Sequence, residues 1–211
     1  MNMWQNKNHW YDGLFYDIFI APNQDKSFRL VKNIIDENST VIDAGCGTGR
    51  FAFSVADKVN KVDGVDLSER NIKTAMNKLA KKNSSKIKFY HSDIYHFFEN
   101  GEKHYDYAVM SYVIHEVDEH LRNNILKTLS QNADKVILID YLAPRPSTYW
   151  SYINEAVEFI AGKEHYRNFK SYIRNGGIKD LAEQNGLKII KEIKNVPSTS
   201  HIVVLQKEKG V

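Results

Sequence analysis

The sequence predicts a three-layer α/β fold, in which a mostly parallel sheet lies between two layers of helices and the last strand runs antiparallel. Three observations predict it. Strand-like and helix-like segments alternate in five successive rounds over residues 40–140, which is typical of a parallel, doubly wound sheet. A glycine-rich turn, GCGTG at residues 45–49, joins the first strand of this series to its first helix. The chain closes with two strand-like segments whose short connection, KNVPSTS, cannot form a parallel crossover.

Composition limits the class of protein. The 211 residues suit one domain, and 42% hydrophobic with 26% charged residues is ordinary for a globular chain. The net charge of +3 is mild and the basic residues are spread, so nucleic acid is not the favoured partner. A single cysteine, Cys46, excludes a disulfide framework and a cysteine-rich metal site. Without a signal-like start or an apolar run of ~20 residues, we expect a cytoplasmic protein with no membrane partner.

The helices and strands are predicted from the spacing of apolar residues and from residues that begin or end helices. Apolar residues at helical spacing predict a helix over residues 10–20, stopped by Pro22, and a second helix over residues 25–35. Ser68 is a favourable N-cap for a helix over residues 69–82. The expected strands of the alternating series are residues 40–43, 61–65, 87–90, 106–112 and 135–140. Its other expected helices are residues 51–59, a short segment before Tyr105, and residues 119–131.

After residue 140 the alternation stops. Pro144 and Pro146 open an insertion, residues 147–175, that is rich in Tyr, Trp, His and Lys. We expect one helix there over residues 149–161, followed by a less regular basic piece, GKEHYRNFKSYIRN. A helix over residues 178–184 ends at Asn185-Gly186, a left-handed C-cap signal. The two last strands are expected over residues 187–193 and 201–206.

The glycine turn distinguishes between two classes of nucleotide-like ligand. A dinucleotide fingerprint, G-x-G-x-x-G, would require a third glycine where the chain has Arg50. The pattern present is D-x-G-x-G-x-G, from Asp43 to Gly49. It resembles the first motif of the class I S-adenosylmethionine-dependent methyltransferases. The resemblance covers most of the chain, because Asp66, the run Ser92-Asp93-Ile94 and the final hairpin are similar to features of that family's Rossmann-like, seven-stranded sheet.

The resemblance implies that S-adenosylmethionine is the cofactor and S-adenosylhomocysteine the product. We expect the α-ammonium group of the cofactor at Asp43, directly or through water, and both ribose hydroxyls at Asp66. The full set of residues expected at the cofactor is Tyr16, Asp43, Ala44, Gly45, Cys46, Gly47, Gly49, Asp66, Leu67, Asp93, Ile94 and Ser111. No metal is expected.

The same resemblance places the adenine between Leu67 and Ile94. Asp93 is expected to accept from its exocyclic amine, while the Ile94 amide donates to a ring nitrogen. The carbonyl of Ser111, at the end of the fourth strand, is expected to face the methionine amine.

Structural roles compete with several of these assignments. Asp43 and Asp93 are each also placed to cap a following helix, and Cys46 is also explained as a small packing residue. Asp66 is harder to explain structurally, because a carboxylate that ends an apolar strand loses hydration unless something pairs with it.

Fewer sequence features indicate where the methyl acceptor binds. His115 and Glu116 follow the fourth strand, where a general base would reach the acceptor; the alternative is a loop histidine packed on the cofactor. The Asn/Asp-Pro-Pro-aromatic motif of enzymes that methylate DNA bases and glutamine is missing there. His115 and His120 are one residue too far apart for the H-E-x-x-H zinc motif. In the insertion, His165 and Tyr166 are candidates to lie near the transferred methyl, or else belong to an amphipathic cover.

The N-terminal WYDGLFYD is similar to the Tyr-Asp pairs that open quinone-biosynthesis methyltransferases, so Tyr11 and Tyr16 are candidates to close over the cofactor. We therefore divide a single domain, residues 1–211, into four parts: an N-terminal helical lid (1–35), a cofactor-binding core (36–143), a helical acceptor-site insertion (144–176), and the last helix with the C-terminal hairpin (177–211).

The expected function is transfer of a methyl group to a small-molecule acceptor by His115, His165 or Tyr166, in a monomer or homodimer. An RNA methyltransferase, on tRNA above all, is the second reading, and a non-catalytic cofactor-binding protein is the third.

Overall fold

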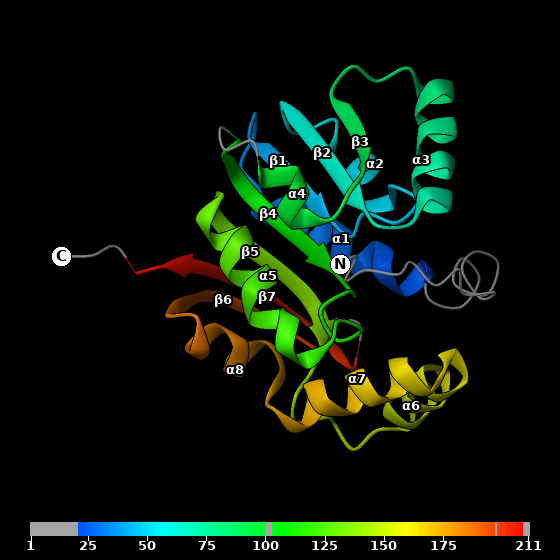
Figure 1. Cartoon of the computed structure of the whole chain (residues 1–211), viewed down its shortest axis with the longest axis vertical. Helices are drawn as coiled ribbons and strands as arrows, with labels where there is room; N and C mark the ends of the chain where they lie inside the picture. The colour runs from blue at the N-terminus through cyan, green and yellow to red at the C-terminus, as the bar shows by residue number, and fades with distance from the viewer. Residues whose placement is uncertain (1–20, 100–102, 197, 209–211) are drawn as a thin grey trace.

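The computed structural model, which describes residues 21–99, 103–196 and 198–208, places seven strands in one sheet (Figure 1). Their bounds are β1 Thr40–Ala44, β2 Lys61–Asp66, β3 Ile87–His91, β4 Tyr105–Ser111, β5 Ala133–Tyr141, β6 Leu187–Lys194 and β7 Ser200–Lys207. In space they follow the order β3-β2-β1-β4-β5-β7-β6. The pairs among β1 to β5 are parallel, and β7 is antiparallel to both β5 and β6. The predicted fold class is confirmed.

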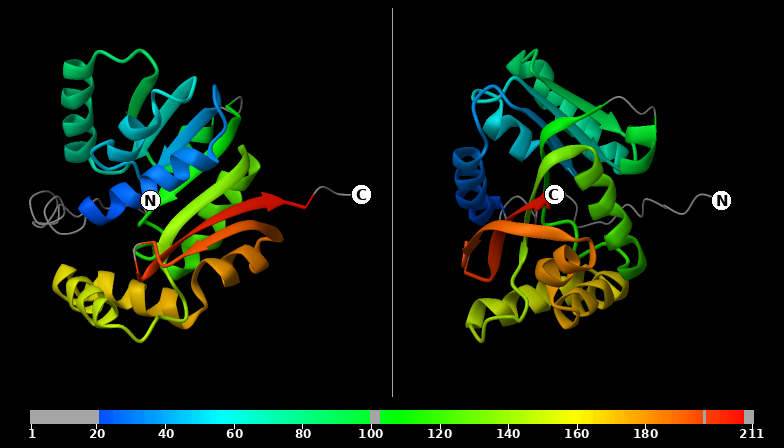
Figure 2. Two further views of the ribbon diagram at one scale, coloured as in Figure 1. Left: turned by 180° about the vertical axis from the view of Figure 1, so that it is seen from behind. Right: turned by 90° about the vertical axis from the view of Figure 1, so that its left-hand side faces the viewer.

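Helices cover both faces of this sheet, as the two views of Figure 2 show. Their bounds are α1 Ala21–Ile34, α2 Arg50–Val55, α3 Glu69–Lys82, α4 Ile94–Glu99, α5 Glu119–Gln131, α6 Tyr149–Ala161, α7 Lys163–Arg174 and α8 Gly177–Gln184. One buried cluster joins the sheet to α1, α2 and α3, and a second joins it to α4, α5, α7 and α8. The helix α6 contributes to neither cluster and lies beside α7 at the periphery of the molecule (Figures 1 and 2).

The strand order reverses direction between β1 and β4. From β1 the chain winds outward through β2 to β3, and it then returns to the opposite side of β1 to form β4. The connections that leave the carboxyl ends of β1 and β4 therefore diverge to opposite faces. In open α/β sheets, ligands bind at this point of divergence.

The N-terminal boundary differs from the prediction. The helix predicted over residues 10–20 lies outside the described residues. The helix predicted over residues 25–35 begins earlier, at Ala21, so Pro22 lies in its first turn. Proline is tolerated there because the amides of a first helical turn have no partner within the helix.

The insertion also differs from the prediction in one respect. The piece expected to be less regular forms the regular helix α7. Its buried stripe contains Asn168 and Ser171 beside Phe169 and Tyr172, and these two polar residues conceal the helical period in the sequence. Both are hydrogen-bonded: Asn168 Nδ2 donates to the Glu116 carbonyl at 2.8 Å, and the Ser171 hydroxyl donates to the Asn168 carbonyl at 3.0 Å.

The other elements lie where the sequence predicts them, with small shifts at their ends. The largest is in α2, which ends at Val55 because residues 56–60 turn the chain back toward β2.

A glycine in the centre of β2 allows a testable prediction about packing. A Cβ atom at Gly64 would lie 2.7 Å from Phe89 Cδ1 and 3.0 Å from Cys46 Sγ. We expect Gly64→Ala to lower the free energy of unfolding by about 1–3 kcal/mol, as overpacked cores do. Urea denaturation of Gly64→Ala, Phe89→Leu and the double variant measures the effect. The double variant should lose less than the sum of the single losses, and strict additivity would contradict the clash.

Candidate active site

The loop from β1 to α2 is an open glycine turn held against β2. Gly45 and Gly47 adopt the left-handed region, at φ of 75° and 52°. The amides of Gly45 and Cys46 donate to the Val65 carbonyl at 2.8 and 3.1 Å. A Cβ at Gly45 would lie 2.6 Å from Val113, whereas one at Gly47 would meet nothing within 4 Å. The loop is thus packed on one side and open on the other, as a backbone cradle requires.

Asp43, near the carboxyl end of β1, is a buried acid with an unpaired oxygen. Its side chain is almost fully inaccessible, and Oδ2 has no hydrogen-bond partner among the described residues. Burial, with the nearby charge of Asp66, raises the pKa of Asp43 to about 8, against a backbone hydrogen bond from Ala52. A buried carboxylate in this state is stabilised by a cation brought to it.

Asp66, at the end of β2, supports the glycine turn. Its Oδ2 accepts from the Gly47 amide and its Oδ1 from the Ser68 amide, both at 2.8 Å. Both carboxylate oxygens of Asp66 therefore hold backbone amides of the loop that follows β1 or β2. The carboxylate is partly exposed, which makes it reachable from the open side of the turn.

The residues predicted at the adenine lie around this same edge. Leu67 is one of the few large apolar side chains that are exposed among the described residues, while Ile94 is buried at the start of α4. Asp93 caps α4, since its Oδ1 accepts from the His96 amide at 2.9 Å. The capping role that competed with adenine binding is therefore present, and the other carboxylate oxygen, Oδ2, lies 3.1 Å from His96 Nδ1.

The remaining predicted cofactor residues are close to the turn or outside the described chain. The hydroxyl of Ser111, which ends β4, is buried and has no hydrogen-bond partner in the described part of the chain. Burial, with the charges of Asp43 and Asp66, raises the pKa of the Cys46 thiol, so the thiol stays protonated and packs as a small apolar group. Ala44 is buried in the core, and Tyr11 and Tyr16 lie outside the described residues.

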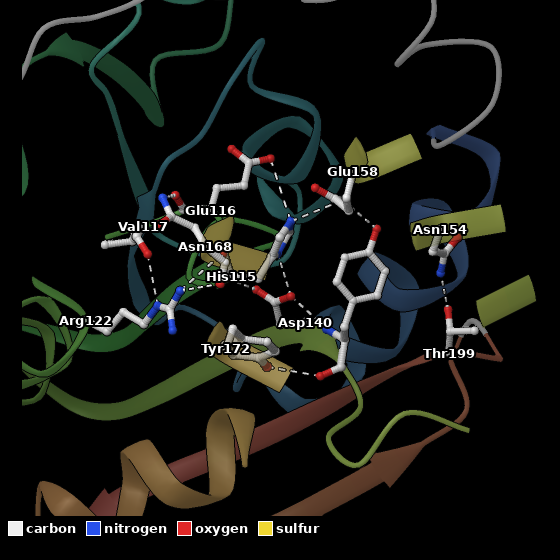
Figure 3. A network of polar contacts seen from close by, with 11 residues as sticks. His115, Glu116, Val117, Arg122, Asp140, Asn154, Glu158, Asn168, Tyr172 and Thr199 are labelled. Carbon is white, nitrogen blue, oxygen red and sulfur yellow. Dashed lines mark hydrogen bonds and ion pairs between the residues drawn. The ribbon is translucent and has the colours of Figure 1, made fainter. Parts of the chain in front are cut away.

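His115 is the centre of a buried polar network beyond β4 (Figure 3). Its Nδ1 lies 2.7 Å from Asp140 Oδ1, and its Nε2 lies 3.5 Å from Glu158 Oε1. The Tyr141 hydroxyl also donates to Glu158 Oε1, at 3.1 Å. Figure 3 shows the imidazole between the two carboxylates, with Glu116 directed at the same nitrogen from 3.8 Å. The network joins β5 to α6 through a histidine of the β4–α5 loop.

These carboxylates keep His115 charged. Burial alone would lower the pKa of the imidazole, but the charges and hydrogen bonds of Asp140 and Glu158 outweigh burial and raise it well above its ordinary value. For Glu158, burial raises the pKa, and the His115 charge more than offsets this, so its pKa lies below the usual range. The imidazole is therefore a cation in this arrangement, and it must release a proton before it can act as a base.

Arg122 of α5 links the loop after His115 to α7 by hydrogen bonds. Its guanidinium donates to the Val117 carbonyl at 2.9 Å and to the Asn168 carbonyl at 2.6 Å (Figure 3). The loop that carries His115 is thus fixed between two helices.

His165 and Tyr166, the two candidate catalytic residues of the insertion, lie near different carboxylates in the structure. His165 lies near enough to Glu158 for a charge on its imidazole to help lower the pKa of that carboxyl. The hydroxyl of Tyr166 instead donates to Glu155, at 2.9 Å, where Lys170 and Arg145 also pair with the carboxylate.

Two members of the network were missed in the sequence. Asp140 ends an apolar strand, KVILID, as Asp66 does, and the same desolvation argument identifies it. Glu158 had a weaker signal, because it is one of only two acids in an otherwise apolar and polar-neutral helix.

The described residues contain no group of three His, Cys, Asp or Glu side chains arranged to hold a metal ion. Among the helices of residues 21–99, 103–196 and 198–208, none combines the length and apolarity that a membrane crossing requires.

Comparison with known proteins identifies the family. The profile of a family described as a methyltransferase domain matches residues 35–197, more than three quarters of the chain. The chain belongs to the class I S-adenosylmethionine-dependent methyltransferases. Within this domain, the open turn at Gly47, the unpaired Asp43 oxygen and Asp66 fit a cofactor that carries an ammonium group and ribose hydroxyls.

Individual relatives are distant. Phosphoethanolamine N-methyltransferase 2 of Caenorhabditis elegans is 25% identical over 95% of this chain and 44% of its own length. Carboxy-S-adenosyl-L-methionine synthase of Nautilia profundicola is 29% identical over 53% of this chain and 47% of its own. The methyltransferase thus spans less than half the length of these curated relatives.

The fold is also found in a solved structure. Magnesium protoporphyrin IX methyltransferase from Synechocystis, crystallised with bound SAH, superposes with a TM-score of 0.63 at 21% identity. The superposition covers 91% of this chain and 86% of that one.

The buried network leads to a prediction about pH. The folded pKa of His115 lies above its ordinary 6.5, so its stabilisation is complete below pH 6.5 and is lost as pH rises through the folded pKa. The folded pKa of Glu158 lies below its ordinary 4.5, so its stabilisation is complete above pH 4.5 and is lost as pH falls through the folded pKa. The coupling between the two should therefore be largest between pH 4.5 and 6.5.

A double-mutant cycle with His115→Gln and Glu158→Gln tests this by urea denaturation. Each single variant should lose about 3 kcal/mol, because it leaves a buried charge without its partner, and the double variant less than the sum. His96→Gln, in an exposed pair with Asp93, is the matched control and should change the free energy of unfolding by under about 1 kcal/mol. A cycle without coupling in this pH range would contradict the ion pair.

Proposed function

We propose that the chain transfers a methyl group from S-adenosylmethionine to a small-molecule acceptor. The observation that carries the donor half is the buried, unpaired Oδ2 of Asp43 beside the open face of Gly47. The acceptor half is supported by the buried polar network that α6 completes over the same edge of the sheet. When bound, the cofactor supplies an activated methyl group on a sulfonium, so the protein has only to position the reactants and exclude water.

On the donor side, we assign the cofactor's α-ammonium group to Asp43. Its carboxylate gains a charge-assisted partner there, which lowers the high pKa that burial imposes. The ribose hydroxyls are assigned to Asp66, which keeps its two bonds to the loop amides. Leu67 and Ile94 are assigned to the two faces of the adenine. Asp93 is assigned to its amine through Oδ2, the oxygen that also lies 3.1 Å from His96 Nδ1. The Ser111 carbonyl is assigned to the methionine amine.

On the acceptor side, we assign proton exchange to His115 and His165. In this assignment His115, which faces Glu158, first releases its own proton to solvent and then accepts the proton that the acceptor loses. Tyr166 is held at Glu155 and belongs to the wall of the site in this assignment. In the same proposal, residues 144–176 act as the acceptor-site insertion and residues 36–143 as the cofactor core.

A small molecule is favoured as the acceptor by two observations. Alpha-helices of the insertion cover the acceptor edge, and their inward side chains form a closed cluster of hydrogen bonds and ion pairs. The relative that aligns with 95% of this chain is named for a small phosphorylated amine. Asp140, Glu158 and Glu116 supply the negative charge that an amine acceptor would meet there.

Cofactor binding should depend on pH through Asp43. Because the carboxylate must be ionised to hold the ammonium group, affinity for S-adenosylhomocysteine should rise with pH toward a plateau above about 8. Below that pH, binding should release a proton. Asp43→Asn should weaken binding about tenfold or more and remove the pH dependence. Calorimetry in two buffers of different ionisation enthalpy measures both effects, with the exposed Asp57→Asn as control. Proton uptake by wild type would overturn the assignment.

The acceptor class is tested with labelled cofactor and fractionated cell extract. We expect label in the low-mass fraction, lost with Asp43→Asn, and no retention of the protein on RNA at physiological salt. Label in the RNA fraction, with retention that falls steeply as salt rises, would instead support the RNA reading. Tight cofactor binding without transfer to any fraction would contradict the enzymatic assignment.

A further inference from the structure

The helix α6 has its polar and apolar faces reversed. Ser151, Asn154, Glu155 and Glu158 lie on the side that faces the protein. All four make polar contacts. Asn154 Nδ2 donates to Thr199 at 2.6 Å and Glu158 pairs with His115 (Figure 3), while Glu155 pairs with Arg145 and the Ser151 hydroxyl donates to the Pro146 carbonyl. A helix that packs on a water-soluble core normally buries its apolar face. Here the buried face is the polar one.

The outer face of α6 is apolar and rich in aromatic rings. Tyr149 is 74% exposed, Trp150 55% and Phe159 65%. The exposed residues of α6 whose burial is described are Tyr149, Trp150, Tyr152, Ala156, Phe159 and Ile160. Five of the eight exposed large hydrophobic residues in the described chain lie on this helix. Such a concentration marks an interaction surface, because single exposed apolar residues are common and clusters of this kind are rare.

A row of cations adjoins this apolar face. Lys163, Arg167, Lys170 and Arg174 are exposed on α7 at spacings of four, three and four residues, which places them on one side of the helix. The two faces adjoin at Tyr166, because its ring lies 5.4 Å from that of Phe159 on α6 and 5.8 Å from the Lys170 ammonium on α7. We call the exposed residues of α6 together with these four cations the α6–α7 surface.

We propose that the α6–α7 surface docks on an anionic lipid bilayer, with the apolar face of α6 at the boundary between headgroups and acyl chains. The chemistry of the surface fits this partner. Tyr and Trp prefer the headgroup level, apolar rings insert just below it, and Lys and Arg pair with anionic headgroups. An interfacial helix needs no long apolar run, so this partner was not visible to the criterion that led us to expect no membrane contact.

The cations argue against a second copy of the chain as the occupant. A two-fold contact uses the same patch on both subunits, so it would bring two sets of the same four cations to one interface. An anionic lipid surface neutralises them instead. The chain's own residues 1–20, which include Trp4, Trp10 and Phe15, are a second competing occupant, and the experiment distinguishes both.

Flotation of the full chain with phospholipid vesicles tests the proposal. We expect binding to vesicles with about one quarter phosphatidylglycerol in phosphatidylcholine, and at least tenfold weaker binding to pure phosphatidylcholine. Binding should fall as salt rises. The double variant Phe159→Ser/Ile160→Ser should bind at least tenfold more weakly, since it removes inserted apolar area. Lys163→Gln/Arg174→Gln should lose about fivefold per cation. Met76→Ser, at an exposed apolar position on α3, should bind as wild type does.

Trp150 reports insertion directly. In a Trp4→Phe/Trp10→Phe background it is the sole tryptophan, and its emission should shift to the blue and be quenched by brominated lipid. Failure of the full chain to bind the anionic vesicles would overturn the proposal, as would binding that Phe159→Ser/Ile160→Ser leaves unchanged. Binding only after removal of residues 1–20 would show that the chain covers its own surface. A dimer by light scattering that this double variant dissociates would assign the surface to a second copy.

Discussion

The structure depends on finding partners for the aspartate carboxylates at the ends of its parallel strands. Parallel strands bring their carboxyl ends to one edge of a sheet, and three of them end in or near an aspartate: Asp43, Asp66 and Asp140. Each carboxylate loses hydration there and must find a partner. Asp66 accepts hydrogen bonds from two loop amides, and Asp140 pairs with the His115 imidazole. One oxygen of Asp43 has no partner among the described residues. The same constraint thus shapes the turn, charges the histidine and leaves a place for a cation.

Much of the fold was predictable because it rests on local patterns. The alternation of strands and helices, the D-x-G-x-G-x-G turn and the short final connection each determine part of the topology without long-range information. The residues expected at the cofactor come from equally local patterns, since Asp43, Gly47 and Asp66 lie at strand ends and in one turn, and their role in binding stays a prediction. Pro22 shows the limit of such rules, because a proline near a helix boundary fits either side of it.

The surroundings of His115 were less accessible to sequence reasoning because they are built from contacts between distant segments. His115 was identified, but its two carboxylate partners lie 25 and 43 residues further along the chain. Whether an imidazole is a base or a fixed cation depends on such partners, so its protonation could not be read from the motif. The period of α7 was hidden for a related reason, since Asn168 is buried only because it bonds to the backbone of the His115 loop.

The bond between Glu158 and His115 has a consequence for how this methyltransferase can change over evolution or by engineering. A helix that only covered the sheet could be exchanged for another cover while the core kept its stability. Here α6 supplies a counter-charge to a histidine that is fully enclosed by the core. A chimera that replaces residues 144–176 without an acid at the position of Glu158 would leave the His115–Asp140 pair one carboxylate short. The helix α6 therefore cannot be exchanged independently of the core. Any segment that replaces residues 144–176 must supply an acid at the position of Glu158.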